Sequence, residues 1–314
     1  MDDSSQLRRR VAAGGADLKE GIERITAAAS DGSSEALYLM ALLVASGIGV
    51  PQDLRASLQH LQRAAEAGHR QAQTDLAALV GNWRLAGEIA AGKLQRPESW
   101  DRLRAAVDIA GWLRVPEGRI FSAEPRIAAV KQYVSPPVCE WLIRLGRPHL
   151  KEAEIYDSES GALRGDSSRT NSAAPLGLEQ IDMVVAFVRA RISTLANVSI
   201  EGLETSQLLH YQVGQEFAAH CDYLDVNNPG HAQDVAMHGQ RALTVLIYLN
   251  DDYAGGDTAF PMLGRSFKGR KGDALIFWNL AQDGAPDGRT LHIGTAPTKG
   301  EKWLFSQWIR IPAS

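Results

Sequence analysis

Residues 207–222 read Q-L-L-H-Y-Q-V-G-Q-E-F-A-A-H-C-D, and the interpretation of the whole chain starts from them. The run Gln207–Val213 has the pattern of a β-strand bounded by turn residues. In extended chain, residues two positions apart lie on the same face. We therefore expect His220 and Asp222 to point together into the mouth of a barrel, and Cys221 to point away from it.

The segments that follow have the same extended character. No helical pattern interrupts them, so we expect an antiparallel jelly roll with a core of about 204–311. Upstream, residues 156–175 are polar and rich in Gly and Ser, which predicts a long loop. The further strands are expected at Leu243–Leu249, Ala274–Trp278, Leu291–Ala296 and Trp303–Ile311, and flanking helices at Ser135–Leu145 and Leu178–Leu195.

A third candidate metal ligand is His292, which lies on a later strand. Two histidines and one carboxylate on one face of a metal are typical of non-haem iron(II) oxygenases. Alone, the His-x-Asp pattern is also compatible with a hydrogen-bonded structural pair. Lys302 and Tyr211 lie close to the candidate ligands in sequence, and a cation and a phenol there can hold the far carboxylate of a dicarboxylate co-substrate.

The first third of the chain contains an internal repeat. A fixed spacing of 36 residues predicts stacked helical hairpins, whose small residues let antiparallel helices approach closely. The block Glu35–Ala72 resembles a Sel1-like repeat, and residues 73–115 are expected to form capping helices. Such a helical layer can hold a protein partner or only support the other domain. Ala28, Gly32 and Ala36 recur 36 residues later as Ala64, Gly68 and Ala72.

Composition narrows the class of protein. The net charge is −4 without a long basic run, which argues against nucleic-acid and membrane-surface binding. Two cysteines cannot form a disulfide framework and favour a cytoplasmic setting. The most apolar stretch, Ala36–Val50, is too short to span a membrane and predicts a buried helix. We expect an α+β protein with a helical repeat domain at 1–115 and a jelly-roll domain at 116–314.

Residues from about Ala123 to Ile311 resemble the prolyl 4-hydroxylase family of 2-oxoglutarate- and iron(II)-dependent dioxygenases. This resemblance implies a double-stranded β-helix core and iron ligation by His220, Asp222 and His292. The similar segments, in the family's order, are V-S-P-P-V-C-E-W-L-I, S-S-R-T-N-S, Y-Q-V-G-Q-E-F-A-A-H-C-D, R-A-L-T-V-L-I-Y-L-N, G-G-D-T-A-F-P, K-G-D-A-L-I-F-W-N and the run from His292 to Lys302.

The resemblance also implies the co-substrates 2-oxoglutarate and O2, with L-ascorbate as reductant. It places the C5 carboxylate of 2-oxoglutarate on Lys302, assisted by Tyr211 and Thr244. The carboxylate ligand favours hydroxylation over halogenation. Arg169 is assigned either to the substrate or to pinning its loop to the barrel, and the two readings are equally open.

Three functions remain open at this point: a hydroxylase of a prolyl or other residue in a peptide or protein, a hydroxylase of a free amino acid or natural-product small molecule, and a catalytically silent binding protein. The polar segment Val226–Gln240 is expected to be a mobile lid over the substrate. We expect its two histidines, His231 and His238, to be solvated loop residues. The remaining expectations are a core position for Trp278 and Trp308, and a place in the barrel lining for Thr258 and Phe260.

Overall fold

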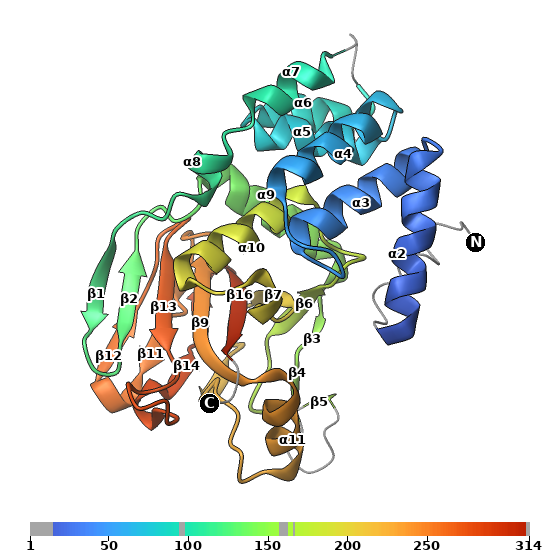
Figure 1. Ribbon diagram of the computed structural model, residues 1–314. Helices are drawn as coiled ribbons and strands as arrows, with labels where there is room; N and C mark the ends of the chain where they lie inside the picture. Colours follow the sequence, from blue (N-terminus) through green and yellow to red (C-terminus); the bar gives the residue numbers. More distant parts are fainter. Residues whose placement is uncertain (1–14, 94–97, 157–162, 166, 312–314) are drawn as a thin grey trace. The chain divides into compact units, whose positions relative to one another are not determined.

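The computed structural model describes residues 15–93, 98–156, 163–165 and 167–311 (Figure 1). The chain divides into two compact units, and the first comprises the N-terminal helices together with the later segment Gly177–Leu195. The division expected at residue 115 makes no allowance for this returning segment, and as a statement about domains it stays a prediction. The helices of the first unit are α2 (Gly15–Ser30), α3 (Ser34–Ser46), α4 (Leu54–Glu66), α5 (Arg70–Leu79), α6 (Trp83–Ala90), α7 (Trp100–Ala106), α8 (Ile109–Leu113) and most of α10 (Met183–Ala196).

One turn recurs between these helices. The amide of Gly32 donates to the carbonyl of Ala29, and 36 residues later Gly68 donates in the same way to Ala65. Both glycines have a φ of +86°, a backbone region that side chains with a Cβ rarely adopt. The spacing seen in the sequence is therefore present in the backbone, whereas the assignment to Sel1-like repeats stays a prediction. The apolar run forms the buried helix α3.

A buried carboxylate lies inside the first unit. Asp75 accepts hydrogen bonds from the Tyr38 hydroxyl at 2.9 Å, the Gln71 amide at 2.7 Å and the backbone N–H of Met183 at 3.2 Å. Burial, and next the charge of Asp182, raise the pKa of Asp75 well above its usual value of 3.8. The folded protein therefore favours the protonated form of this carboxyl group.

The second unit is built on two antiparallel sheets. The larger has the strand order β1-β2-β13-β9-β16-β7-β6-β3 and the smaller the order β12-β11-β14-β8, and in Figure 1 β1 lies at the edge of the larger sheet. Apolar side chains such as Tyr248, Phe260 and Phe277 form the buried core of this unit. The strands of the larger sheet are β1 (Gly118–Ser122), β2 (Ile127–Val130), β3 (Lys151–Glu152), β6 (Ser172–Leu176), β7 (Ser206–Tyr211), β9 (Gln240–Tyr248), β13 (Ala274–Trp278) and β16 (Lys302–Ile311), and those of the smaller are β8 (Phe217–His220), β11 (Thr258–Phe260), β12 (Arg265–Phe267) and β14 (His292–Gly294).

Shorter elements complete the second unit. The N-terminal turn of its helix α9 carries two prolines, at a position where the missing N–H of proline costs no hydrogen bond. No helix among the described residues is long and apolar enough to cross a membrane. These elements are α9 (Pro136–Gly146), α11 (Pro229–His238), the two-stranded sheets β4 (Glu154–Tyr156)–β5 (Leu163–Gly165) and β10 (Ala254–Gly255)–β15 (Pro297–Lys299), and 3-10 turns at Arg147–His149, Ile200–Gly202, Pro261–Leu263 and Gly288–Thr290.

Two local expectations are wrong. A helix, α11, does lie between strands β8 and β9, because Asn228 and Pro229 start it and Gly239, with a φ of +82°, ends it. The predicted loop 156–175 contains strands β5 and β6, although residues 157–162 and 166 fall outside the described part of the chain. In both places the turn-forming residues predict a loop, and the short elements among them lack the strong apolar periodicity that would indicate a helix or strand.

Candidate active site

The three predicted metal ligands come together. His220 ends strand β8 and is paired in register with His292, which begins β14, and their ring centroids are 4.2 Å apart. Strand β8 ends before Asp222, so the carboxylate reaches the histidines from a bend rather than from the strand predicted for it. Its two oxygens lie 3.6 Å from His220 Nε2 and 3.8 Å from His292 Nε2. One ligand atom from each residue lies within 4.8 Å of the other two.

Backbone carbonyls set the orientation of both imidazoles. Nδ1 of His220 lies 2.8 Å from the carbonyl of Ala218, and Nδ1 of His292 lies 3.1 Å from that of Thr290. A carbonyl only accepts, so each Nδ1 carries the proton and each Nε2 keeps a lone pair toward the cluster. Burial and the neighbouring His292 lower the pKa of His220 to about 3, which keeps the ring neutral, as a metal ligand must be.

A hydrogen-bonded relay holds the carboxylate. The Thr244 hydroxyl donates to Asp222 Oδ2 at 2.6 Å, and the Asn279 amide donates to that hydroxyl at 3.0 Å. Burial opposes ionisation of Asp222, but the two histidines and the Thr244 bond outweigh it, so its pKa lies below the usual value. The structure therefore places Thr244 at the candidate iron carboxylate, and its predicted contact with 2-oxoglutarate stays a prediction. Asn279 was not singled out from the sequence.

Lys302 lies at the inner end of a narrow cavity that reaches the ligands. It is fully buried and pairs in register with Tyr211, and its ammonium lies 5.0 Å from the centre of that ring. Among the described residues this ammonium has no hydrogen-bond partner. Burial lowers its pKa to about 7. A buried cation without an acceptor fits the distal carboxylate of 2-oxoglutarate, because that carboxylate would supply the missing acceptor.

The wall of this inner cavity extends the predicted set. Thr258 and Gly294 line it together with Tyr211, and the Thr258 hydroxyl lies 2.7 Å from the hydroxyl of Tyr248. Phe260 is fully buried in the barrel core, as expected, and packs beside His292 with ring centroids 5.9 Å apart. A Cβ on Gly294 would lie 3.0 Å from the Tyr211 hydroxyl, so a residue without a side chain leaves room for this tyrosine.

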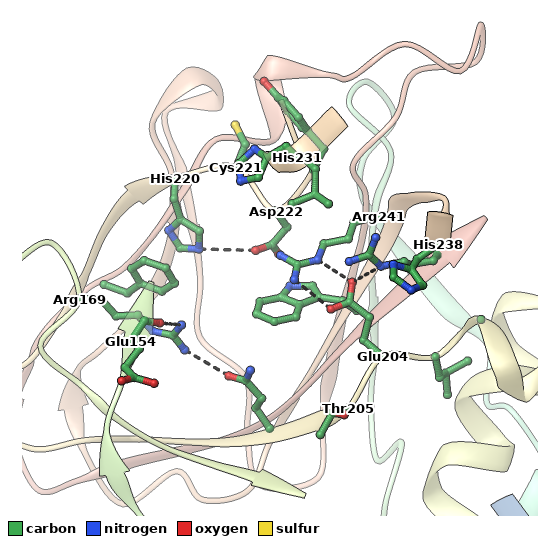
Figure 2. A pocket seen from close by; sticks show the side chains of 18 of the residues that line it. Glu154, Arg169, Glu204, Thr205, His220, Cys221, Asp222, His231, His238 and Arg241 are labelled. Carbon is green, nitrogen blue, oxygen red and sulfur yellow. Dashed lines mark hydrogen bonds and ion pairs between the residues drawn. The ribbon is translucent and has the colours of Figure 1, made fainter. Parts of the chain in front are cut away.

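A wider outer cavity of about 780 Å³ opens on the other side of the ligands (Figure 2). Arg241 crosses it, with its guanidinium 3.9 Å above the Trp308 ring and two bonds to Glu204 at 2.6 and 2.9 Å. The expected core position of Trp308 is wrong, since this residue lines both cavities. Strand parity could have revealed this: the inner-cavity residues of β16 are Lys302, Leu304, Ser306 and Trp308.

Trp278 does not line either cavity. The guanidinium of Arg126 lies 3.7 Å above its ring, and the residue is half-buried at the end of β13. Its expected core position is therefore met only in part, because the ring stays half-buried.

Helix α11 forms part of the outer cavity. His231 and His238 lie on this helix and line the cavity, so the expectation of a loop is wrong, whereas the expected solvation holds for His238, whose side chain is 61% exposed. Arg310 ties the helix to the barrel with bonds to Asp234 at 2.8 Å, to the carbonyl of Gly239 at 2.9 Å and to Glu204 at 2.7 Å.

Arg169 holds its loop to the barrel, and its assignment to the substrate stays a prediction. Its guanidinium donates to the carbonyl of Glu154 at 2.9 Å, and to Asn171 and Gln207 at 3.3 Å each, which fixes the surrounding loop. It also lines both cavities and lies 4.6 Å above the Phe217 ring, which in turn stacks on His220 with centroids 3.5 Å apart. Figure 2 shows this guanidinium on the Glu154 side of the cavity.

The comparisons with known proteins agree with this geometry. The sequence pattern of the family described as "2OG-Fe(II) oxygenase superfamily" matches residues 206–310. "Probable prolyl 4-hydroxylase 10" of Arabidopsis thaliana is 32% identical over 212 residues, which cover 61% of this chain and 71% of that protein. "Prolyl 4-hydroxylase 5" of the same plant is 34% identical over 212 residues, covering 61% and 70%.

Among solved structures, the viral collagen prolyl hydroxylase of Paramecium Bursaria Chlorella virus-1 is similar with a TM-score of 0.45 and 23% identity. The alignment covers 59% of this chain and 95% of that protein. The two plant relatives, which are 32% and 34% identical and are covered over 71% and 70% of their length, establish the family. The chain belongs to the prolyl 4-hydroxylase family and is a 2-oxoglutarate- and iron(II)-dependent dioxygenase.

Proposed function

We propose that the enzyme hydroxylates a prolyl residue within a peptide or protein. The outer cavity carries this proposal: it is about 780 Å³ in volume, passes directly beside His220 and Asp222, and is lined by polar and aromatic side chains. A cavity of this kind can hold a residue together with its flanking main chain. The prolyl 4-hydroxylases to which the chain is similar support proline as the target residue.

Iron(II), when bound by His220, Asp222 and His292, couples the oxidative decarboxylation of 2-oxoglutarate by O2 to hydroxylation of a C–H bond, with succinate and CO2 as products. The chain's own residues position the reactants. Lys302 binds the far carboxylate of 2-oxoglutarate, and the Thr244 relay orients the carboxylate ligand. The aromatic rings around His292 exclude water from that side of the centre.

A panel of short peptides tests the substrate class. Each peptide contains one proline, and its control has alanine at the same position; free proline is a third substrate. The proposal predicts a mass gain of one oxygen atom on the proline peptides, with an equal yield of succinate. Hydroxylation of free proline but of none of the peptides would instead assign the enzyme to small molecules.

We also propose three properties that follow from the resemblance and the sequence. L-ascorbate serves as reductant, and the two free cysteines support a cytoplasmic location. The helical unit is built of Sel1-like repeats that capture the substrate or a partner protein, which the recurring turn at Gly32 and Gly68 supports. If the unit captures the substrate, reversing the charge of exposed Arg55 on α4 should raise the KM for the protein substrate without changing decarboxylation of 2-oxoglutarate in its absence. An unchanged KM would argue against substrate capture by this face of the unit.

A further inference from the structure

A third cavity, of about 420 Å³, lies between the edge strands of the two sheets of the second unit. Its walls come from β1, the end of β2, β12 and the residues that follow β12. No residue of this groove lines either cavity of the active site. We call it the edge groove; its lining residues are Arg119, Ile120, Phe121, Ala129, Val130, Lys131, Arg265, Phe267, Lys268, Arg270 and Asp273.

The edge groove carries an unbalanced positive charge, although the whole chain has a net charge of −4. Five of its residues are basic and one is acidic, and the described part of the chain places no carboxylate in an ion pair with any of the five. Lys268 donates to the carbonyl of Tyr253, and Arg265 donates to that of Phe121, so their contacts leave the charge uncompensated. The two carboxylate oxygens of Asp273 accept from the backbone amides of Gln132 and Arg270.

The spacing of these cations suits an extended anion. Arg119 pairs in register with Ala129, and Lys131 follows the end of β2 two residues later, so both cations line the same side of the groove. Arg265 and Arg270 project from the opposite wall of the groove. Charges distributed over two walls match carboxylates that recur along a peptide better than they match one compact anion.

The apolar side chains of the edge groove favour a peptide over a nucleic acid. Ile120 is 80% exposed on edge strand β1, where an aliphatic side chain of a partner could cover it. The Phe121 ring offers little to a base, since the Arg265 guanidinium lies 4.0 Å above it and Phe267 packs edge-on at 5.7 Å. Base stacking needs an open aromatic face.

We propose that the edge groove binds an acidic, extended segment of a partner protein that carries aliphatic residues between its carboxylates. This site lies outside the active site, so binding there does not require hydroxylation of the bound segment. It gives the enzyme a surface that recruits or anchors a protein independently of the residue to be oxidised.

The test uses the full chain and fluorescence anisotropy with a labelled peptide that alternates Glu and Val. The groove variant combines Arg119→Glu with Lys131→Glu. Its matched control combines Lys151→Glu with Lys299→Glu, two exposed lysines elsewhere in the same unit that change the charge equally. Decarboxylation of 2-oxoglutarate without substrate serves as the folding check, because none of the four residues lines the active site.

We expect the groove variant to bind the Glu-Val peptide at least about tenfold more weakly than the unaltered protein, and the control variant to bind it within about twofold. A Gln-Val peptide should not bind, and Ile120→Ser should weaken binding without changing its salt dependence. Equal losses in both double variants, or equal binding of the Gln-Val peptide, would overturn the proposal. The proposal would also be overturned if an oligothymidylate bound more tightly than the peptide and if its binding were lost in the groove variant.

Discussion

Removing the charge of Lys302 should raise the stability of the folded protein and lower its affinity for 2-oxoglutarate. Its side chain is fully buried, and its ammonium has no hydrogen-bond acceptor among the described residues. Burial lowers its pKa from 10.5 to about 7. At 1.36 kcal/mol per pKa unit, this difference corresponds to a destabilisation of the folded protein of about 5 kcal/mol when the lysine is charged. Lys302→Met removes the charge and keeps most of the side-chain volume.

The sign of the effect depends on pH. Between pH 7 and 10.5 the unfolded chain binds a proton at this lysine that the folded chain has released, so the stability of the unaltered protein rises with pH through that window. Lys302→Met should therefore be more stable than the unaltered protein below pH 7, by several kcal/mol in urea unfolding without 2-oxoglutarate. The advantage should shrink with rising pH and disappear near pH 10.5.

The affinity of Lys302→Met for 2-oxoglutarate should change in the opposite direction. Without the ammonium, the far carboxylate of the bound co-substrate lies buried without a partner, which should raise the Kd at least about tenfold in anaerobic titrations with iron(II). Lys299→Met, at an exposed position on strand β15, which precedes β16 in the sequence, is the matched control and should leave both quantities unchanged. Equal stability below pH 7 combined with an unchanged Kd would refute this role of Lys302.

Three further substitutions test other parts of the account. Thr244→Val removes the donor to Asp222 and leaves the Asn279 amide without its acceptor, so iron(II) affinity should fall about tenfold in anaerobic titration. The control Thr194→Val should leave the affinity unchanged. Equal iron(II) affinities of Thr244→Val and the unaltered protein would mean that the relay does not orient the ligand. Asp234→Asn weakens the tie between Arg310 and helix α11, so the KM for a peptide substrate should rise while decarboxylation without substrate stays constant, and loss of both would contradict a role confined to the outer cavity. Asp75→Asn mimics the protonated carboxyl group. Because the pKa of Asp75 is raised in the folded protein, the stability of the unaltered protein falls as pH rises above about 4. The melting temperature of the variant should therefore exceed that of the unaltered protein by a margin that grows toward neutral pH, and a constant margin would contradict the raised pKa.

The candidate site could be predicted where its chemistry depends on short sequence spacings. His220 and Asp222 are two residues apart, and His292 and Lys302 are separated by only ten positions, although they lie on strands of the two different sheets. The strand Ala274–Trp278 was visible because it is a continuous apolar run, and Trp303–Ile311 because it is rich in apolar residues, which predicts buried strands. For these features local pattern and tertiary position agree.

The parts that could not be predicted depend on contacts between distant segments. The bond from Asn279 to Thr244 joins residues 35 positions apart, and the one from Arg310 to Asp234 joins residues 76 positions apart. No periodicity reports such pairs. Helix α11 was missed because only one of its residues, Val235, is buried, so it has no apolar face to recognise.

The most direct test of the central claim is the conversion of 2-oxoglutarate to succinate by the purified full chain, measured with and without iron(II) and in the variant Asp222→Ala. The account predicts succinate formation that requires iron(II) and is abolished in Asp222→Ala, while the circular dichroism spectrum and the melting transition show that the variant remains folded. Turnover by folded Asp222→Ala at the rate of the unaltered protein, or turnover independent of iron(II), would contradict the assignment of His220, Asp222 and His292 as the metal centre.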